Sequence, residues 1–257
     1  MSRIGNAFKN KKPFIGFVTG GDPSIARTKE YIRAMIEAGT DLVEIGVPFS
    51  DPIAEGPVIQ AANIRALAAG TTVDKLFGLV ADLRRETEVP LVFLTYLNPV
   101  FHYGYEAFFA RAEEAGLDGI IIPDLPGEEQ GEVRPYAASH GVDLISLVAP
   151  TSEQRIRTIA SEATGFLYIV SSMGVTGVRS EIRTDLPSII ASARAVSETP
   201  IAVGFGIHTP EQAAEISKIA DGVIVGSRIV KIIEEHPDDA ETHLSEYVRA
   251  MKSAIGS

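Results

Sequence analysis

Short apolar runs alternate with amphipathic segments along the whole chain. Eight such runs are rich in Val, Ile, Leu and Phe. That composition is typical of strands buried on both faces in a parallel sheet. The runs cover residues 14–19, 42–47, 91–96, 119–123, 144–150, 166–171, 200–206 and 222–227. The pattern therefore predicts eight strands separated by other elements.

The segments between these runs place apolar residues at helical spacing. The clearest predicted helices lie at 24–38, 72–86, 105–115, 128–139, 152–162, 184–197 and 210–219. Several begin at a hydroxyl residue that can cap a helix, namely Ser24, Thr72, Ser152 and Thr209. Several end at a glycine just before the next run, namely Gly39, Gly116, Gly141 and Gly165.

Eight strand–helix units in succession predict a closed (β/α)8 barrel, with an open, doubly wound sheet as the alternative. The length of 257 residues fits a single barrel domain over 1–257. In such barrels the catalytic groups lie at the carboxyl ends of the strands and in the loops that follow. We therefore look for chemistry there.

Composition excludes several classes of protein. The chain contains no run of 18 apolar residues, so no membrane span is predicted. The basic N-terminus lacks an apolar signal core. The absence of cysteine excludes disulfides, thiol nucleophiles and cysteine-bound metals, and it is compatible with the cytoplasmic location that we expect. The formal net charge of −11 argues against nucleic-acid binding.

Three late loops carry glycine at the end of a predicted strand: GVTGV (174–178), GFGI (204–207) and VGSR (225–228). Glycine lets the backbone approach a bulky anion and present its N–H groups. The third loop leads into a helical stretch, and Ser227 stands at the N-terminus that would favour an anion. Any one loop taken alone is better explained by ordinary turn glycines. Three loops on one side of a barrel favour a phosphate site.

Glu44 lies within the second apolar run. Leu42 and Glu44 share one face of the predicted strand, and Val43 and Ile45 share the other. If the fully apolar face packs against the helices, Glu44 points into the barrel near its mouth. Burial there raises the pKa of an unpaired carboxyl and suits a general acid or base. A structural charge that is satisfied by a hydroxyl or a water is the alternative.

The loop after this strand, residues 47–60, contains three prolines and the carboxylates Asp51 and Glu55. It is stiff and cannot become helical until after Pro57. Catalysis or contact with a partner explains such a loop, and plain solvation is the alternative.

Aromatic and apolar residues at other strand ends together suit a pocket for a flat aromatic group, although each one taken singly is better explained as a core residue. They are Phe17, Leu94, Tyr96 and Tyr168. The chain's eight lysines all fall in predicted helices or terminal segments, so none suits a Schiff-base aldolase. The five histidines are scattered over loops and helices, so we expect no metal site. Proton transfer by carboxylates on a phosphorylated substrate remains.

Six segments together resemble the tryptophan synthase α-subunit family, in its order and spacing, over essentially the whole chain. They are FVTGGDP (17–23), VEIGVPFSDPIAEGPVIQ (43–60), YLNPV (96–100), GVTGV (174–178), GFGI (204–207) and VGSRIVKIIE (225–234). The resemblance implies a (β/α)8 TIM barrel with a short extra N-terminal helix and long βα loops 2 and 6. It also implies retro-aldol cleavage of indole-3-glycerol phosphate to indole and glyceraldehyde 3-phosphate, a lyase reaction of tryptophan biosynthesis.

The resemblance implies roles for particular residues. Glu44 matches the general acid–base glutamate, and Tyr168 matches a tyrosine close to it. Glu55 stands where the family usually has an aspartate that pairs with the indole nitrogen; its extra methylene requires the loop backbone to retreat or the side chain to fold. The implied indole pocket is formed by Phe17, Leu94 and Tyr96. The implied phosphate contacts are Gly177, Gly206, Gly226 and Ser227, and the implied substrate-binding Thr176 lies on the sixth loop.

The resemblance also implies a partner, a β subunit that carries pyridoxal phosphate, usually in an αββα assembly. Asp51, Pro52 and the 98–104 loop, including Asn98, match its contact regions. No cofactor is expected in this chain. Alternatives are another phosphate-binding barrel (an isomerase or indole-glycerol-phosphate synthase), a free-standing indole-3-glycerol-phosphate lyase, and a non-catalytic barrel that activates a partner. The retained Glu44 argues against the last.

Overall fold

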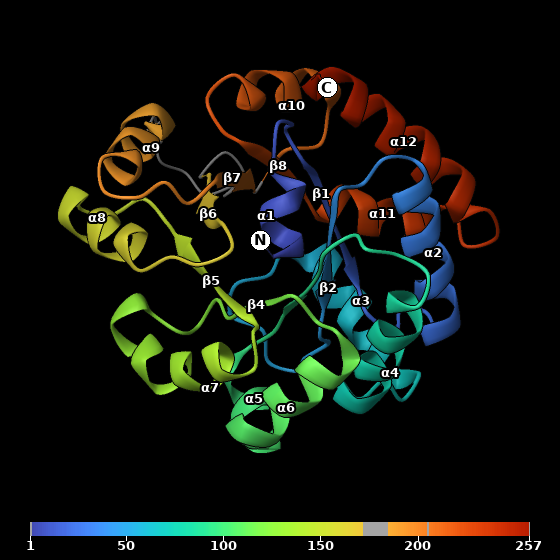
Figure 1. Cartoon of the computed structure of the whole chain (residues 1–257). Helices are drawn as coiled ribbons and strands as arrows, with labels where there is room; N and C mark the ends of the chain where they lie inside the picture. Colours follow the sequence, from blue (N-terminus) through green and yellow to red (C-terminus); the bar gives the residue numbers. More distant parts are fainter. Residues whose placement is uncertain (1, 172–184, 205, 257) are drawn as a thin grey trace.

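Eight parallel strands close into a barrel in the computed structural model, which describes residues 2–171, 185–204 and 206–256 (Figure 1). The strands pair in chain order, and β8 returns to pair with β1. The alternative of an open sheet is therefore wrong. The strands are β1 (Phe14–Thr19), β2 (Leu42–Gly46), β3 (Leu91–Leu94), β4 (Gly119–Ile121), β5 (Asp143–Val148), β6 (Leu167–Val170), β7 (Ile201–Gly204) and β8 (Gly222–Val225).

Helices surround the barrel as an outer ring, except for α1, which lies over the centre of the barrel in Figure 1. They are α1 (Arg3–Ala7), α2 (Ile25–Glu37), α3 (Pro57–Ala68), α4 (Val73–Arg84), α5 (Leu97–Tyr103), α6 (Tyr105–Ala115), the 3-10 turn η1 (Gly127–Glu132), α7 (Arg134–Ser139), α8 (Glu153–Ser161), α9 (Leu186–Arg194), α10 (Pro210–Ser217), α11 (Ser227–Glu235) and α12 (Ala240–Ile255). Within the ranges that the structure describes, no helix is long and apolar enough to cross a membrane.

The predicted helix boundaries are confirmed at the caps. Each of the four hydroxyl residues accepts a hydrogen bond from the backbone N–H three residues further on: Ser24, Thr72, Ser152 and Thr209. The four predicted terminal glycines all have positive φ: Gly39, Gly116, Gly141 and Gly165. A positive φ stops a helix and costs little without a Cβ.

Two helix predictions are wrong in detail. Residues 98–104, expected as a loop, are mostly the helix α5, because Pro99 falls in its first turn, where a proline needs no N–H partner. The Asp124 carboxylate accepts the Leu97 N–H at 2.8 Å and caps this turn. The single helix expected at 128–139 is divided into η1 and α7, because Pro135 can only stand near the start of α7.

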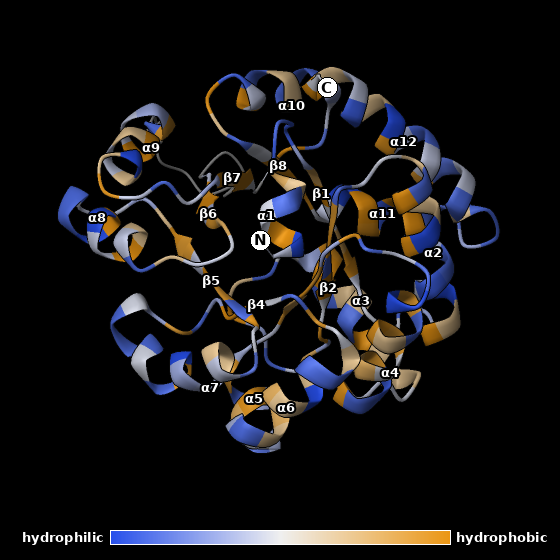
Figure 2. Cartoon of the chain, viewed as in Figure 1, coloured by the Kyte–Doolittle hydropathy of each residue, from blue (hydrophilic) through white to orange (hydrophobic). Residues whose placement is uncertain are grey.

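The side chains of the strands form two separate layers. Leu42 lies in the cluster inside the barrel, together with Ile15 and Val92, whereas Val43 and Ile45 lie in the larger cluster between strands and helices. Figure 2 shows mainly orange strands inside a ring of helices that carry many blue residues. The short helix α1 is the expected extra N-terminal helix, and its Ile4 joins the interior cluster. The short helix thereby closes the amino end of the barrel, which leaves the carboxyl end for ligands.

Candidate active site

Glu44 is buried inside the barrel, on the face that the alternation in β2 predicts. Its side chain is only 1% exposed, and none of the described residues provides a hydrogen-bond partner for its Oε1. Burial alone raises the pKa of this carboxyl from 4.5 to about 8. The group therefore holds its proton at neutral pH and can still release it, which is the property of a general acid–base.

Two aromatic side chains lie beside Glu44. Phe17 is its register partner on β1. Burial raises the pKa of Tyr168, and the charge of Glu44 raises that pKa further, so the phenol stays protonated near the carboxyl. A Cβ at Gly46 would lie 2.6 Å from Phe17 Cζ, and one at Gly204 would lie 2.5 Å from Tyr168 Oη. These two glycines make room for the rings; Gly204 was predicted only as part of a phosphate loop, and no role was predicted for Gly46.

A small apolar cluster lies at the carboxyl end of the barrel and includes Phe17, the register partner of Glu44. Phe17 packs with Ala62 of α3 and Val230 of α11, and Leu94 packs against the same cluster. Leu94 also contacts the interior cluster that contains Tyr168. The structure thus brings Phe17, Leu94 and Tyr168 together, as predicted for a site that receives a flat ring.

Tyr96 lies beneath loop 2, the segment of residues 47–56 between β2 and α3. Its ring packs on Phe49 with a centroid distance of 5.3 Å, and its hydroxyl accepts the Ala54 N–H at 3.1 Å. The tyrosine is 1% exposed and supports the loop that carries Glu55. Its role in contacting a substrate stays a prediction.

Glu55 is half-buried and is held by α3. Asn63 Nδ2 donates a hydrogen bond of 2.6 Å to Glu55 Oε2. Burial raises the pKa of the Glu55 carboxyl, while the hydrogen bonds from Asn63 and Tyr96 oppose that rise. The longer side chain is thus turned towards α3, consistent with the expectation that it must fold. Asn63 is 3% exposed and was missed, although a polar residue on the buried face of a helix is a usable signal.

The expected phosphate site is partly visible. Gly226 precedes the first turn of α11, and Ser227 is the first residue of that helix. The first N–H groups of a helix lack partners within it and attract anions. Gly206 has φ of +78°, which suits glycine. Thr176 and Gly177 lie outside the described residues.

An ion network connects the elements around this end of the barrel. Asp22, 2% exposed in the loop after β1, accepts two hydrogen bonds of 2.8 Å from the guanidinium of Arg65 on α3. Arg65 also contacts Glu234 of α11 at 3.0 Å. A bidentate pair of this kind fixes geometry as well as adding energy. It holds α3, which carries Asn63, against the helix that begins at Ser227.

The residues predicted to contact a partner lie in loop 2 and at the start of α5. Asp51 and Asn98 are exposed, and Pro52 is partly buried. Two neighbouring apolar side chains are unusually exposed, Ile53 at 78% and Phe101 at 65%. An exposed apolar group of this kind is typical of an interaction surface.

The positions of the lysines agree with the sequence prediction, and those of the histidines agree with one exception. The five lysines outside the N-terminal segment lie on helices or, for Lys218, at a helix cap, so none is at the carboxyl end of a strand. The description of the histidines as scattered is wrong for His236 and His243, whose rings stack at 3.6 Å. This pair lies where α11 ends and α12 begins, away from the strand ends.

Comparison with known proteins agrees with this geometry. The model of the family "Tryptophan synthase alpha chain" matches residues 5–255. The chain is 49% identical to the tryptophan synthase alpha chain of Lactiplantibacillus plantarum, over 99% of this chain and 97% of that one. The solved alpha subunit of Legionella pneumophila superposes with a TM-score of 0.88 at 37% identity, covering 99% and 98% of the two chains. A chain of the tryptophan synthase complex of Pyrococcus furiosus superposes with a TM-score of 0.84 at 33% identity, covering 94% of this chain and 98% of that one. The chain therefore belongs to the tryptophan synthase alpha chain family.

Proposed function

We propose that Glu44 is the general acid and base of the reaction that this chain catalyses. The chain is a lyase of tryptophan biosynthesis, and it cleaves indole-3-glycerol phosphate to indole and glyceraldehyde 3-phosphate. The observation that carries the proposal is a fully buried carboxyl whose Oε1 has no hydrogen-bond partner among the described residues, so that burial raises its pKa to about 8. At neutral pH it holds the proton that the first step requires.

The cleavage needs one proton delivered and one removed. Protonated Glu44 gives its proton to C3 of the indole ring, which places a positive charge on the ring nitrogen. The resulting carboxylate takes the proton of the glycerol hydroxyl next to the ring. As the C=O bond of the aldehyde forms, the bond from C3 to the glycerol carbon breaks, and its electron pair restores the neutral indole. Glu44 ends protonated, and the atoms and charges balance without a lysine.

Glu55 stabilises the charge that develops on the indole nitrogen. An ionised carboxylate that is already oriented stabilises such a charge without reorganisation during the reaction. Asn63 and Tyr96 supply that orientation, and their hydrogen bonds favour the ionised form of Glu55. The extra methylene relative to the family's usual aspartate is accommodated by the contact with α3.

The N-terminus of α11 anchors the phosphate. A Cβ at Gly226 would lie 3.6 Å from Cβ of Phe17, so the anchor and the aromatic pocket adjoin. Gly206 and Ser227 complete the described part of this anchor, and Thr176 and Gly177 are proposed to join it. Binding energy at the phosphate thus holds the reacting bond against Glu44.

The chain works with a β subunit that carries pyridoxal phosphate, in an α2β2 assembly. The similarity to a chain of the Pyrococcus furiosus tryptophan synthase complex supports the partnership. The exposed Ile53 and Phe101 supply apolar surface beside Asp51, Pro52 and Asn98, which we assign to the interface. No described residue of this chain has the position of a pyridoxal lysine at a strand end.

Indole release from indole-3-glycerol phosphate tests the proposal, measured with the purified chain alone and with a β subunit. We expect release in both cases and a faster rate in the complex. Full activity that is unchanged by the β subunit would favour a free-standing lyase. No indole in either case would refute the activity. Near-normal cleavage by Glu55→Gln would remove Glu55 from the mechanism.

A further inference from the structure

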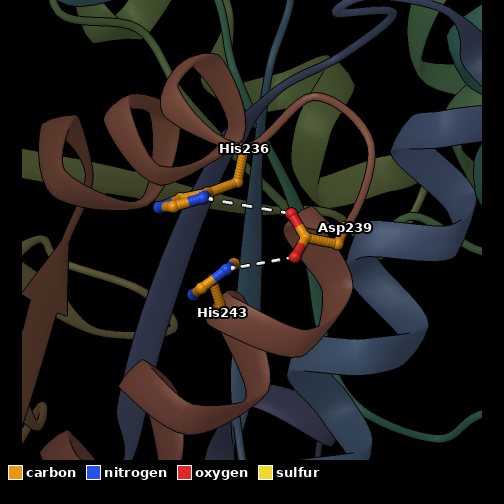
Figure 3. A group of neighbouring side chains, drawn as sticks. All are labelled: His236, Asp239 and His243. Carbon is orange, nitrogen blue, oxygen red and sulfur yellow. Dashed lines mark ion pairs between the residues drawn. The ribbon is translucent and has the colours of Figure 1, made fainter.

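Three potential metal ligands meet where α11 passes into α12. His236 ends α11, Asp239 precedes α12, and His243 lies one turn inside α12. Their ligand atoms all lie within 4.8 Å of one another, and both imidazole rings face the same carboxylate (Figure 3). The proposed cleavage uses none of these residues.

The distances suit a metal ion. Zinc binds imidazole nitrogen and carboxylate oxygen at about 2.0–2.2 Å, so two of its ligand atoms cannot be more than about 4.4 Å apart. His243 Nε2 lies 3.3 Å from Asp239 Oδ2, and His236 Nδ1 lies 3.9 Å from Asp239 Oδ1. The rings, now stacked at 3.6 Å, need a rotation to converge. Both side chains are about a third exposed (36%), so this rotation disturbs no core packing.

The charges around the group favour a cation. In the part of the chain that is described, no lysine or arginine pairs with Asp239, whose ion-pair partners are the two imidazoles. Arg27 of α2 pairs with Glu30 and Glu241, and both cations of α11, Arg228 and Lys231, pair with Glu235.

A further carboxylate stands behind one of the rings. Glu246 Oε2 lies 4.0 Å from Nδ1 of His243. At this distance the two groups form an ion-pair contact and no hydrogen bond. Once the ring turns towards a metal, an outer carboxylate that accepts the second ring N–H makes the other nitrogen more basic.

We propose that His236, Asp239 and His243 bind a divalent transition-metal ion of the zinc class, with water in the fourth position. Imidazole and carboxylate ligands select such ions over magnesium or calcium. The ion joins the end of α11 to the start of α12 across Pro237 and Asp238. Because Ser227 stands at the opposite end of α11, the ion takes no part in the cleavage.

Zinc titration of untagged, chelator-treated protein tests this inference by calorimetry, with cobalt absorption as a second measurement. We expect one zinc per chain. At free zinc 100-fold above Kd, the unfolding equilibrium constant should fall about 100-fold. Loss of an outer partner weakens metal binding by about 10–100-fold, so Glu246→Gln should weaken zinc binding by about tenfold. Asp239→Asn and His243→Ala each remove or weaken a direct ligand and should therefore weaken zinc binding more than that.

The matched control is His140→Gln. This change removes a histidine that contacts Glu106 and Glu113 elsewhere on the surface, and it should leave zinc binding unchanged. Absence of saturable binding would overturn the inference. So would binding that survives His243→Ala and Asp239→Asn, or binding that is lost in His140→Gln. None of these measurements depends on catalytic activity, so their failure leaves the proposed function untouched.

Discussion

Glu44 and Asp118 are both buried carboxylates, at opposite ends of the barrel, and their surroundings differ completely. Asp118 precedes β4 and is 8% exposed; it accepts the Leu91 N–H at 2.8 Å and pairs with Arg84 at 2.6 Å and Arg3 at 3.2 Å. Glu44 is 1% exposed, and no described residue partners its Oε1. Burial at the amino end is compensated and holds the strands together. Burial at the carboxyl end is left uncompensated, which keeps a proton available for chemistry.

The compensated arrangement repeats around the amino end. Asp41, Asp118 and Asp221 each stand just before a strand and accept the first N–H of the preceding strand, from Phe14, Leu91 and Ile201, at 2.9, 2.8 and 2.9 Å. Each also pairs with a lysine or arginine. This end of a barrel is where stability is expected to concentrate.

Replacing Glu44 should give the largest effect on the reaction. Glu44→Gln keeps the shape of the side chain but removes the proton donor, so we expect kcat to fall by about 10²–10⁴-fold. Single-turnover indole formation measures this. Activity within threefold of the unmodified chain would contradict the comparison.

The same variant should gain stability relative to the unmodified chain as pH rises. The folded pKa of about 8 exceeds the unfolded value of 4.5, so the folded chain binds more protons between these values. The free energy of unfolding contributed by Glu44 therefore falls as pH rises through that window, by several kcal/mol at most, on the order of 1.4 kcal/mol per pH unit. Denaturation at pH 5 and pH 8 should show Glu44→Gln gaining on the unmodified chain; a constant difference would mean that Glu44 has an ordinary pKa.

Removing Asp118 should cost stability and not chemistry. Asp118→Ala leaves Arg84 buried and unpaired, and loss of one partner of a buried pair costs about 3–5 kcal/mol. Urea unfolding measures the loss. At a temperature where the variant stays folded, kcat should be unchanged; a large fall in kcat would show that the two ends are not separable.

The pH dependence of the reaction should follow Glu44. Because the protonated carboxyl starts the cleavage, kcat/KM should fall above about pH 8, approaching tenfold per pH unit. Rates from pH 6 to 10 at constant ionic strength measure this. A profile that stays level to pH 10 would assign the proton to another group.

Loosening Glu55 should give the smallest effect. Asn63→Ala removes one hydrogen bond to the charged group, an interaction of about 1.5–3 kcal/mol, and we expect kcat to fall by up to about tenfold. Gln60→Ala is the matched control, because Gln60 donates to the backbone oxygen of Glu55 and not to its carboxylate. Equal losses in both variants would indicate a general effect on loop 2.

Local patterns in the chain predicted much of this molecule. Alternation in β2 placed Glu44 inside the barrel, and hydroxyl caps and terminal glycines placed the helix ends, because each depends on residues that are neighbours in sequence. The predictions were wrong at α5 and α7 because both helices contain a proline. A proline breaks the interior of a helix but is accepted in the first turn.

The sequence by itself determined the eight strands, the direction in which Glu44 points and the glycine that precedes α11, since periodicity and backbone sterics act over a few residues. Only the tertiary structure decided that Asn63 holds Glu55, that Gly46 and Gly204 make space for Phe17 and Tyr168, and that His236 and His243 meet beside Asp239. Those contacts depend on how helices and strands pack. Packing brings side chains into contact, and their spacing in the sequence alone does not predict the distance between them.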